Sequence, residues 1–357
     1  MASLRTDAPA RAPAVAERPA PRIGFAKGLC FAAITLLLVL LAIEAAVRAY
    51  HVVRNVGTGD APRGYVVDDP QTGYSLKPGY SSGGIRVNSR GFRGPEVAVA
   101  KAPGVYRIVT LGDSATFGPR EVECAYPYLL PDLLAPRRVE VVNAGVEGYR
   151  SDRALAHLQR DVMPLEPDLV TVFIGWNDLY QTDPSVESDQ LSLRGSPLAQ
   201  ALTLSDAAQT FRRLFFLRVH SGRAQTSAAS SSLPPGYEPV GYGERLRAII
   251  QTARAGGASV VLFTWPTILG DTMAPDAVAK VHYPPYTTSL PELRTLYQRY
   301  QAMLRQVASD EGVPVVDNAA IFPDDQKAAL FVDTAHFTCQ GQAMVAGNVA
   351  RAVAVAQ

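Results

Sequence analysis

Two short polar groups, far apart in the chain, carry residue types that can do nucleophilic chemistry together. Ser114 ends the segment LGDS (111–114), and His336 ends the segment DTAH (333–336). A serine hydroxyl is a weak nucleophile until a base takes its proton, and histidine suits that task because its pKa lies near neutrality. Asp333 can accept from the other ring nitrogen and stabilise the imidazolium. These residues predict a nucleophile, a base and its orienting carboxylate.

Two further groups offer hydrogen-bond donors for a developing negative charge. Gly145 ends NAG (143–145), and it can present its backbone N–H with no side chain in the way. Asn177, within GWND (175–178), can donate its side-chain amide. The N–H of Ser114 is expected at the start of a helix, where partial positive charge favours an anion. Ser114, Gly145 and Asn177 are therefore predicted to form an oxyanion hole.

The elements that must position these groups alternate regularly from residue 105. Strands are predicted over residues 106–111, 139–144, 168–175, 258–266 and 313–317, and helices over 126–134, 151–162, 243–257, 291–312 and 338–356. Such alternation predicts an α/β fold with a parallel sheet and right-handed crossovers. The active site of such a sheet lies beyond the carboxyl ends of its strands. The groups LGDS, NAG and GWND come at the ends of the first three predicted strands, and the group DTAH precedes the last predicted helix.

These motifs resemble the four blocks of the SGNH/GDSL hydrolase family, in the family's order: GDS, NAG, GxND and DxxH. The resemblance covers residues 105–350 and implies a flavodoxin-like three-layer α/β/α fold with a five-stranded parallel sheet. It also implies ester hydrolysis through an acyl-Ser114 intermediate, with no metal or organic cofactor. Ala115 stands where the family name has leucine, a position without a catalytic role.

Each motif alone also has a plain structural interpretation. Residues 112–114 can form a turn and a helix cap, with Asp113 as support for the turn. Gly145 can be a turn glycine, Asn177 a loop residue, and His336 an ordinary surface or core histidine. Because all of them occur together at the expected elements, the catalytic interpretation is favoured.

The N-terminal part predicts attachment to a membrane. Residues 1–22 are rich in Ala, Pro and Arg and predict a disordered cytoplasmic tail. Residues 23–48 contain the apolar run 29–43, which predicts a transmembrane anchor, with a cleaved signal peptide as the alternative. Because the basic residues precede this run, the positive-inside rule places the N-terminus in the cytoplasm and the catalytic domain in the periplasm or outside the cell.

Three further stretches complete the predicted organisation. Residues 49–104 form a juxtamembrane segment with short strands or a hairpin. Within it, residues 85–96 (IRVNSRGFRGPE) resemble a stretch upstream of the motif in membrane-attached bacterial members of the family. The hydrolase domain takes residues 105–357. It is interrupted at 181–240 by a polar, Ser-rich insert around a helical piece at 202–219, which can be a lid or a substrate-binding loop.

Charge and cysteine content narrow the possible functions. The formal net charge of +1 argues against nucleic acid as a partner. Three cysteines without CxxC spacing make a cysteine metal site improbable. Cys124 lies ten residues after Ser114, and Cys339 three after His336, so both belong near the same edge of the sheet. A Cys124–Cys339 disulfide is possible outside the cytoplasm, the alternative being two unpaired thiols.

Three functions remain open on the sequence. The first is an extracytoplasmic carboxylic ester hydrolase, acting on acylated sugars or envelope polysaccharide. The second is an O-acyltransferase that passes the same acyl group to a sugar hydroxyl instead of water. The third is a non-catalytic binding protein that kept the fold. The intact set Ser114, His336 and Asp333 disfavours the third, and the single membrane span favours hydrolysis over transfer.

Overall fold

The computed structural model describes residues 24–54, 64–182, 184, 233–234 and 236–355. The predicted cytoplasmic tail at 1–22 lies outside these residues, as do most of the insert at 181–240 and its predicted helical piece at 202–219.

Five strands form one parallel sheet in the order β6-β5-β7-β8-β9. They are β5 (Tyr106–Gly112), β6 (Val139–Gly145), β7 (Leu169–Phe173), β8 (Ser259–Phe263) and β9 (Val315–Val316). The first strand of this sheet lies between the second and the third, which is the flavodoxin-like order. The predicted α/β fold with a five-stranded parallel sheet is confirmed. The last strand is shorter than predicted and lies at the edge of the sheet.

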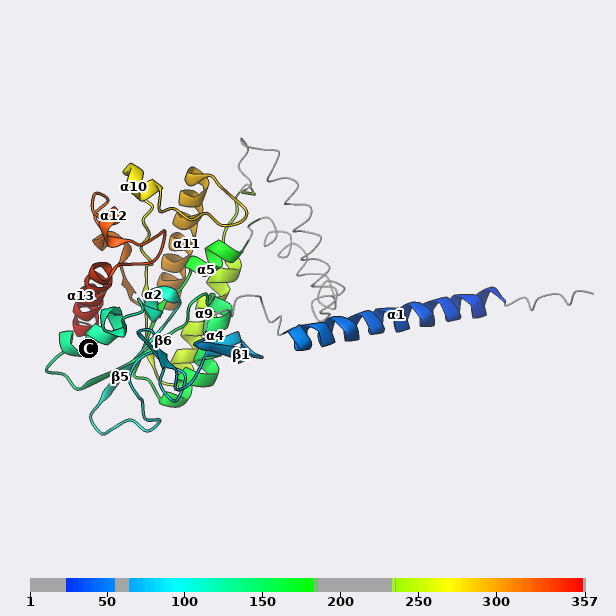
Figure 1. Ribbon diagram of the computed structural model, residues 1–357, viewed down its shortest axis with the longest axis horizontal. Helices are drawn as coiled ribbons and strands as arrows, with labels where there is room; N and C mark the ends of the chain where they lie inside the picture. The colour runs from blue at the N-terminus through cyan, green and yellow to red at the C-terminus, as the bar shows by residue number, and fades with distance from the viewer. Residues whose placement is uncertain (1–23, 55–63, 183, 185–232, 235, 356–357) are drawn as a thin grey trace, which may run out of the picture.

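Helices cover both faces of the sheet. The long ones are α3 (Tyr126–Leu133), α4 (Ser151–His157), α9 (Val240–Ala255), α11 (Leu290–Glu311) and α13 (Cys339–Val355). Helices α3 and α13 pack together, while α9 packs on both α4 and α11 (Figure 1). The predicted helix at 151–162 ends early, and residues Leu158–Val162 continue as a π-helical turn. Pro164 follows this turn and has no N–H to continue an α-helix.

Short elements connect the long ones. They are α2 (Ser114–Phe117), α5 (Trp176–Gln181), α10 (Pro275–Val278), α12 (Lys327–Leu330) and the 3₁₀ turns Val122–Cys124, Met163–Leu165 and Ala319–Ile321. The inner strands β5 and β7 are almost wholly buried, as expected when helices cover both faces.

The register of the three neighbouring strands brings the motif residues to one edge. Gly112, at the end of β5, pairs with Gly145 of β6 and with Phe173 of β7. The three strands therefore end level, and the segments that follow them begin at the same rim. This rim is the carboxyl edge of the sheet, where ligands bind in folds of this kind.

The helix α1 (Phe25–Arg54) lies apart from the sheet (Figure 1). Its stretch Lys27–Val47 has 21 residues with a mean hydropathy of 2.6 and is not buried against the rest of the chain. A helix of this length and composition can cross a bilayer. It can be a membrane anchor or a signal sequence, since both meet the same criteria.

Residues 64–97, called here the N-terminal segment, form two small antiparallel hairpins. The first pairs β1 (Val66–Asp69) with β2 (Gly73–Leu76), and the second pairs β3 (Ser81–Ser82) with β4 (Ile85–Arg86). The segment contributes buried side chains to the main core, among them Tyr74, Leu76, Ile85, Val87 and Phe92. It is therefore packed as part of the α/β unit.

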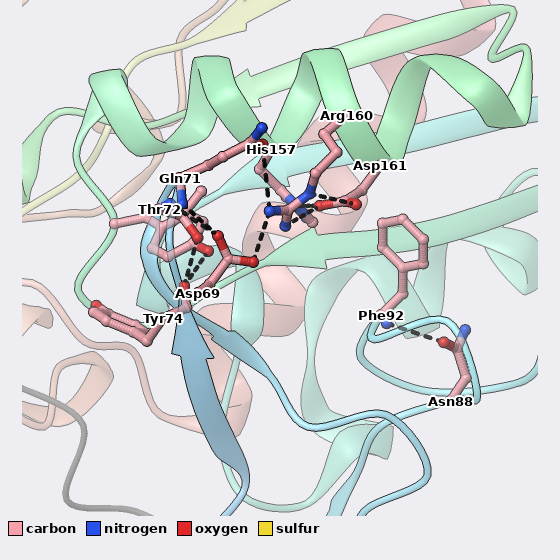
Figure 2. A network of polar contacts seen from close by, with 10 residues as sticks. Asp69, Gln71, Thr72, Tyr74, Asn88, Phe92, His157, Arg160 and Asp161 are labelled. Carbon is pink, nitrogen blue, oxygen red and sulfur yellow. Dashed lines mark hydrogen bonds and ion pairs between the residues drawn. The ribbon is translucent and has the colours of Figure 1, made fainter. Parts of the chain in front are cut away.

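Polar contacts fasten the first hairpin to the turn after α4 (Figure 2). Asp69 accepts hydrogen bonds from the backbone N–H groups of Gln71 and Thr72, and its second oxygen pairs with Arg160 at 2.6 Å. Arg160 also pairs with Asp161 at 2.7 Å. These contacts fix the hairpin beside the helix that follows β6.

Candidate active site

Ser114 is the first residue of α2, a single helical turn that begins where β5 ends. Asp113 caps the turn, because its carboxylate accepts from the Ala115 N–H at 2.9 Å. The tight turn directs the serine hydroxyl toward the carboxyl edge of the sheet, where it is half-buried.

Two buried side chains hold α2 from opposite sides. Asn143, at the end of β6, donates to the Thr116 carbonyl at 2.9 Å. Gln342, on α13, donates to the Ala115 carbonyl at 3.0 Å. Gly145 closes the third side, since a Cβ at this position would lie 2.3 Å from the backbone nitrogen of Phe117. The position of Ser114 is thereby fixed by several independent contacts.

His336 lies within hydrogen-bonding distance of the serine. Its Nε2 is 2.8 Å from Ser114 Oγ, and its Nδ1 is 2.7 Å from one carboxylate oxygen of Asp333. The other oxygen of Asp333 accepts from the backbone N–H groups of Ala335 and His336, both at 3.0 Å. An ionised carboxylate only accepts hydrogen bonds, so it favours the tautomer with the proton on Nδ1. Nε2 is then free to accept the serine proton.

Thr334 anchors the loop that carries His336 through its carbonyl and its hydroxyl. The Thr334 carbonyl accepts from Ile268 N–H at 3.0 Å and from the Thr267 hydroxyl at 2.7 Å. Its own hydroxyl accepts from His282 N–H at 2.6 Å. Thr334 is buried, whereas the His336 side chain is 45% exposed. The loop thus has a buried anchor and an exposed tip.

Asp333 and His336 each favour the charged form of the other. Burial raises the pKa of Asp333, but the hydrogen bond and charge of His336 outweigh burial and hold it at about 2. Burial lowers the pKa of His336, yet the Asp333 hydrogen bond and charge raise it above the ordinary value of 6.5. Burial raises the pKa of Asp113 to about 7. The carboxylate beside the imidazole is therefore ionised throughout the neutral range.

The three donors expected around an oxyanion differ in their availability. Among the described residues, the Ser114 N–H has no hydrogen-bond acceptor. Asn177 donates one amide hydrogen to the Tyr149 carbonyl at 3.1 Å, which leaves its second hydrogen. The Gly145 N–H already donates to the Asn143 side-chain oxygen at 2.9 Å. The third donor is thus engaged within its own segment.

A buried carboxylate beside Asn177 fixes this part of the rim. Asp178 accepts from the Ser151 N–H at 2.8 Å and from its hydroxyl at 2.5 Å, and it pairs with Arg245 at 3.1 Å. It therefore joins the start of α5 to the start of α4 and to α9. Asp178, Asn143 and Gln342 were not predicted as functional residues. The first two stand inside the quoted motifs GWND and NAG, which is the signal that could have found them.

A disulfide joins the two sides of the site. Cys124, after α2, is bonded to Cys339 at the start of α13, across a sequence separation of 215 residues. Cys339 lies three residues after His336. The bridge therefore links the serine side of the rim to the histidine side.

A row of serine, histidine and aspartate on a flavodoxin-like sheet defines an α/β enzyme of the serine hydrolase class. Among the described residues, no group of three or more His, Cys, Asp and Glu side chains could hold a metal ion. Residues 110–344 match the model of the GDSL-like lipase/acylhydrolase family, and the chain belongs to this family. It is a hydrolase, and the resemblance drawn from the four motifs is confirmed.

Solved structures of similar fold include hydrolases of several bacteria. An acetylxylan esterase from Geobacillus stearothermophilus is 19% identical with a TM-score of 0.44, and the match covers 69% of this chain and 93% of that one. A GDSL-like lipase from Bacteroides thetaiotaomicron is 16% identical with a TM-score of 0.41, covering 70% and 89%. At these identities the likeness is one of fold alone. No curated protein matches the chain.

Proposed function

We propose that the protein is a serine esterase that cleaves carboxylic esters through an acyl-Ser114 intermediate. The observation that carries this proposal is the 2.8 Å contact between Ser114 Oγ and His336 Nε2, with Asp333 bonded to the other ring nitrogen. Family membership supports the coarser statement, an esterase or acylhydrolase. The hydrogen-bonded row supports the individual roles.

In the proposed mechanism, His336 Nε2 takes the hydroxyl proton as Ser114 Oγ forms a bond to the ester carbonyl carbon. Asp333 stabilises the resulting imidazolium through Nδ1–H. The imidazolium then gives its proton to the leaving alcohol as the ester C–O bond breaks, which leaves the acyl group on Ser114. Water, deprotonated by His336, attacks this acyl group, releases the carboxylic acid and restores the serine.

The proposed oxyanion hole uses the Ser114 N–H and the second amide hydrogen of Asn177. Gly145 N–H is a third donor only if it is shared between the Asn143 oxygen and the oxyanion. Shared N–H groups of this kind are common in proteins. We therefore expect Gly145 to contribute less than the other two donors.

The proposed location is outside the cytoplasm, with α1 retained as a single-pass anchor and the N-terminus inside. The basic residues before the apolar stretch support this orientation. The Cys124–Cys339 bridge supports an oxidising compartment, because disulfides are rare in the reducing cytosol. Acylated sugars or envelope polysaccharide are the proposed esters, since that compartment presents them.

The test compares the full chain with Ser114→Ala, both in detergent micelles, on p-nitrophenyl acetate. We expect Ser114→Ala to lose at least about 10³-fold in kcat, because the triad acts as a unit. Ser81→Ala, at an exposed serine on β3, is the matched control and keeps wild-type turnover. Equal turnover by Ser114→Ala and wild type would remove the proposal. Transfer of the acetyl group to a hydroxyl of an added sugar, in place of release of acetate, would indicate the O-acyltransferase alternative.

A further inference from the structure

A cleft of about 600 Å³ lies beside the proposed catalytic row and is used by none of the roles above. One wall comes from α2 and the loop after it, through Phe117 and Arg120, and from Glu147 after β6. The other wall comes from the N-terminal segment, through Tyr65, Tyr80 and Ser82. Its volume falls within the range of about 300–1,000 Å³ usual for small-molecule sites.

The cleft is close enough to Ser114 to hold part of a substrate bound there. Phe117 ends the helical turn that Ser114 begins, so the two Cα atoms are separated by about 5 Å. Glu147 follows Gly145 by two residues, and its charge contributes to the raised pKa of His336. The cleft therefore begins within one helical turn of Ser114.

Two almost fully buried aromatic rings support the cleft, since Tyr65 is 5% and Phe117 1% exposed. The Tyr65 ring stacks on Phe117 with a centroid distance of 5.7 Å, and its hydroxyl donates to the Glu147 carboxylate. Beneath Phe117 lies the buried guanidinium of Arg93, 4.2 Å from the ring centroid. Arg93 also donates to the carbonyls of Pro119 and Arg120, at 2.6 and 2.7 Å. These contacts fix the loop that lines the cleft before any ligand arrives.

The rim of the cleft is polar. The Ser82 hydroxyl, the Arg120 guanidinium and the Glu147 carboxylate all line it, together with the partly exposed ring of Tyr80. A long acyl chain would remove water from the charged groups without replacing their hydrogen bonds, which is costly. A sugar presents hydroxyl groups to such a rim and a C–H face to the partly exposed ring of Tyr80. The chemistry of the lining therefore selects a polyhydroxylated group.

We propose that this cleft, half of it built by the N-terminal segment, binds the sugar portion of an acylated carbohydrate, on the alcohol side of the ester. The inference rests on the proposed esterase function, and it assigns the sugar part of the proposed substrate to this cleft. In this arrangement the segment between the membrane helix and the sheet is a substrate-binding wall. It selects the alcohol while the motif residues perform the chemistry.

The test uses two substitutions in the same two-residue strand of the full chain. Ser82 lines the cleft, and its neighbour Ser81 does not, because adjacent strand residues point to opposite faces. Both are exposed. We expect Ser82→Trp to fill the cleft and lower kcat/KM for peracetylated cellobiose at least tenfold relative to Ser81→Trp. Both variants should stay within twofold of wild type on ethyl acetate, because its alcohol portion is too small to reach the cleft.

Two outcomes would overturn the inference. In one, both tryptophan variants cleave the sugar ester equally well. In the other, Ser82→Trp selectively loses p-nitrophenyl laurate, which would make the cleft an acyl pocket. If melting curves show that Ser82→Trp does not fold, Arg120→Ala takes its place, since this exposed side chain lines the same rim. Arg120→Ala should lower turnover of the sugar ester at least threefold and leave turnover of ethyl acetate unchanged.

A binding measurement separates this inference from the esterase proposal. Saturation-transfer NMR on Ser114→Ala should detect cellobiose on the full chain, and adding Ser82→Trp should abolish the signal while Ser81→Trp keeps it. Sugar binding without Ser114-dependent hydrolysis would refute the esterase and support the cleft. Ser114-dependent hydrolysis with no effect of Ser82→Trp on either sugar assay would support the esterase and refute sugar binding in the cleft.

Discussion

The serine side and the histidine side of the rim are held in different ways. Around Ser114, the anchoring groups Asp113, Asn143 and Gln342 are all buried, at 3%, 6% and 1% exposed. On the other side, the His336 side chain is 45% exposed and stands on a loop whose buried anchor is Thr334. One partner is embedded in a short helix between two strands, while the other reaches it from a surface loop.

Because the two sides are held differently, substitutions on each side should have different effects. Several contacts fix the position of Ser114, the proposed nucleophile, so the loss of one contact leaves the others to hold α2. The orientation of the imidazole depends on one direct partner, Asp333, and on the loop that carries both residues. Changes on the histidine side should therefore affect turnover most, and changes on the serine side should be better tolerated.

The largest effect is expected for Asp333→Asn. Asparagine keeps the shape and can still accept from the loop N–H groups, but its amide can donate to Nδ1 and favour the wrong tautomer of His336. We expect kcat on p-nitrophenyl acetate to fall by about 10³- to 10⁴-fold. A stopped assay over a range of substrate concentrations gives kcat and KM separately, and KM should change little.

The same carboxamide change at an exposed position provides the control. Asp132→Asn, on α3, removes one charge from the surface and should leave kcat unchanged. A loss of less than tenfold in Asp333→Asn would mean that the loop alone orients the imidazole. In that case the contrast between the two sides would have to be abandoned.

The second effect concerns the bridge between the two sides. In Cys124→Ser/Cys339→Ser the disulfide is absent, and the free energy of unfolding should fall by about 2–5 kcal/mol because the unfolded chain is less restricted. Turnover at 25 °C should fall less than threefold, since Gln342 and Thr334 still hold their loops. Chemical denaturation monitored by fluorescence measures the stability. Cys30→Ser, at the exposed free cysteine of α1, should change neither quantity.

Much of the fold followed from patterns that lie within single elements. The apolar runs predicted all five strands, and the rule for parallel sheets predicted that their polar ends meet at one edge. Ser114 and His336 lie 222 residues apart in the sequence, but they meet at this edge of the sheet. Short motifs at strand ends could therefore predict the neighbourhood of both residues.

The residues that hold the site in place, in contrast, show no recognisable pattern in the sequence. Gln342 donates to a backbone carbonyl 227 residues away, and any residue can supply a carbonyl. The strands of the N-terminal segment have two to four residues, too few for a period to be visible. Its role as a wall of the cleft depends on how the hairpins pack against α2, which only the assembled structure reveals.

The smallest expected effect concerns the charge of Asp113, on the serine side, and its influence on the pKa of His336. His336 must be neutral to accept the serine proton, so turnover falls on acidification as the ring becomes protonated. Because its pKa is raised, that loss should be centred above pH 6.5 in the wild-type chain. The negative charge of Asp113 is one of the groups that raise this pKa.

In Asp113→Asn the cap of α2 is retained, because asparagine caps helices about as well as aspartate. The charge is removed, so protonated His336 loses some stabilisation and its pKa falls. We expect the acid limb of the pH profile of kcat/KM to move to lower pH by less than one pH unit, with turnover at pH 8 nearly unchanged. A limb that does not move would show that Asp113 is uncharged wherever His336 titrates. A large loss at pH 8 would show that α2 depends on this one cap, and that the serine side is no more redundant than the histidine side.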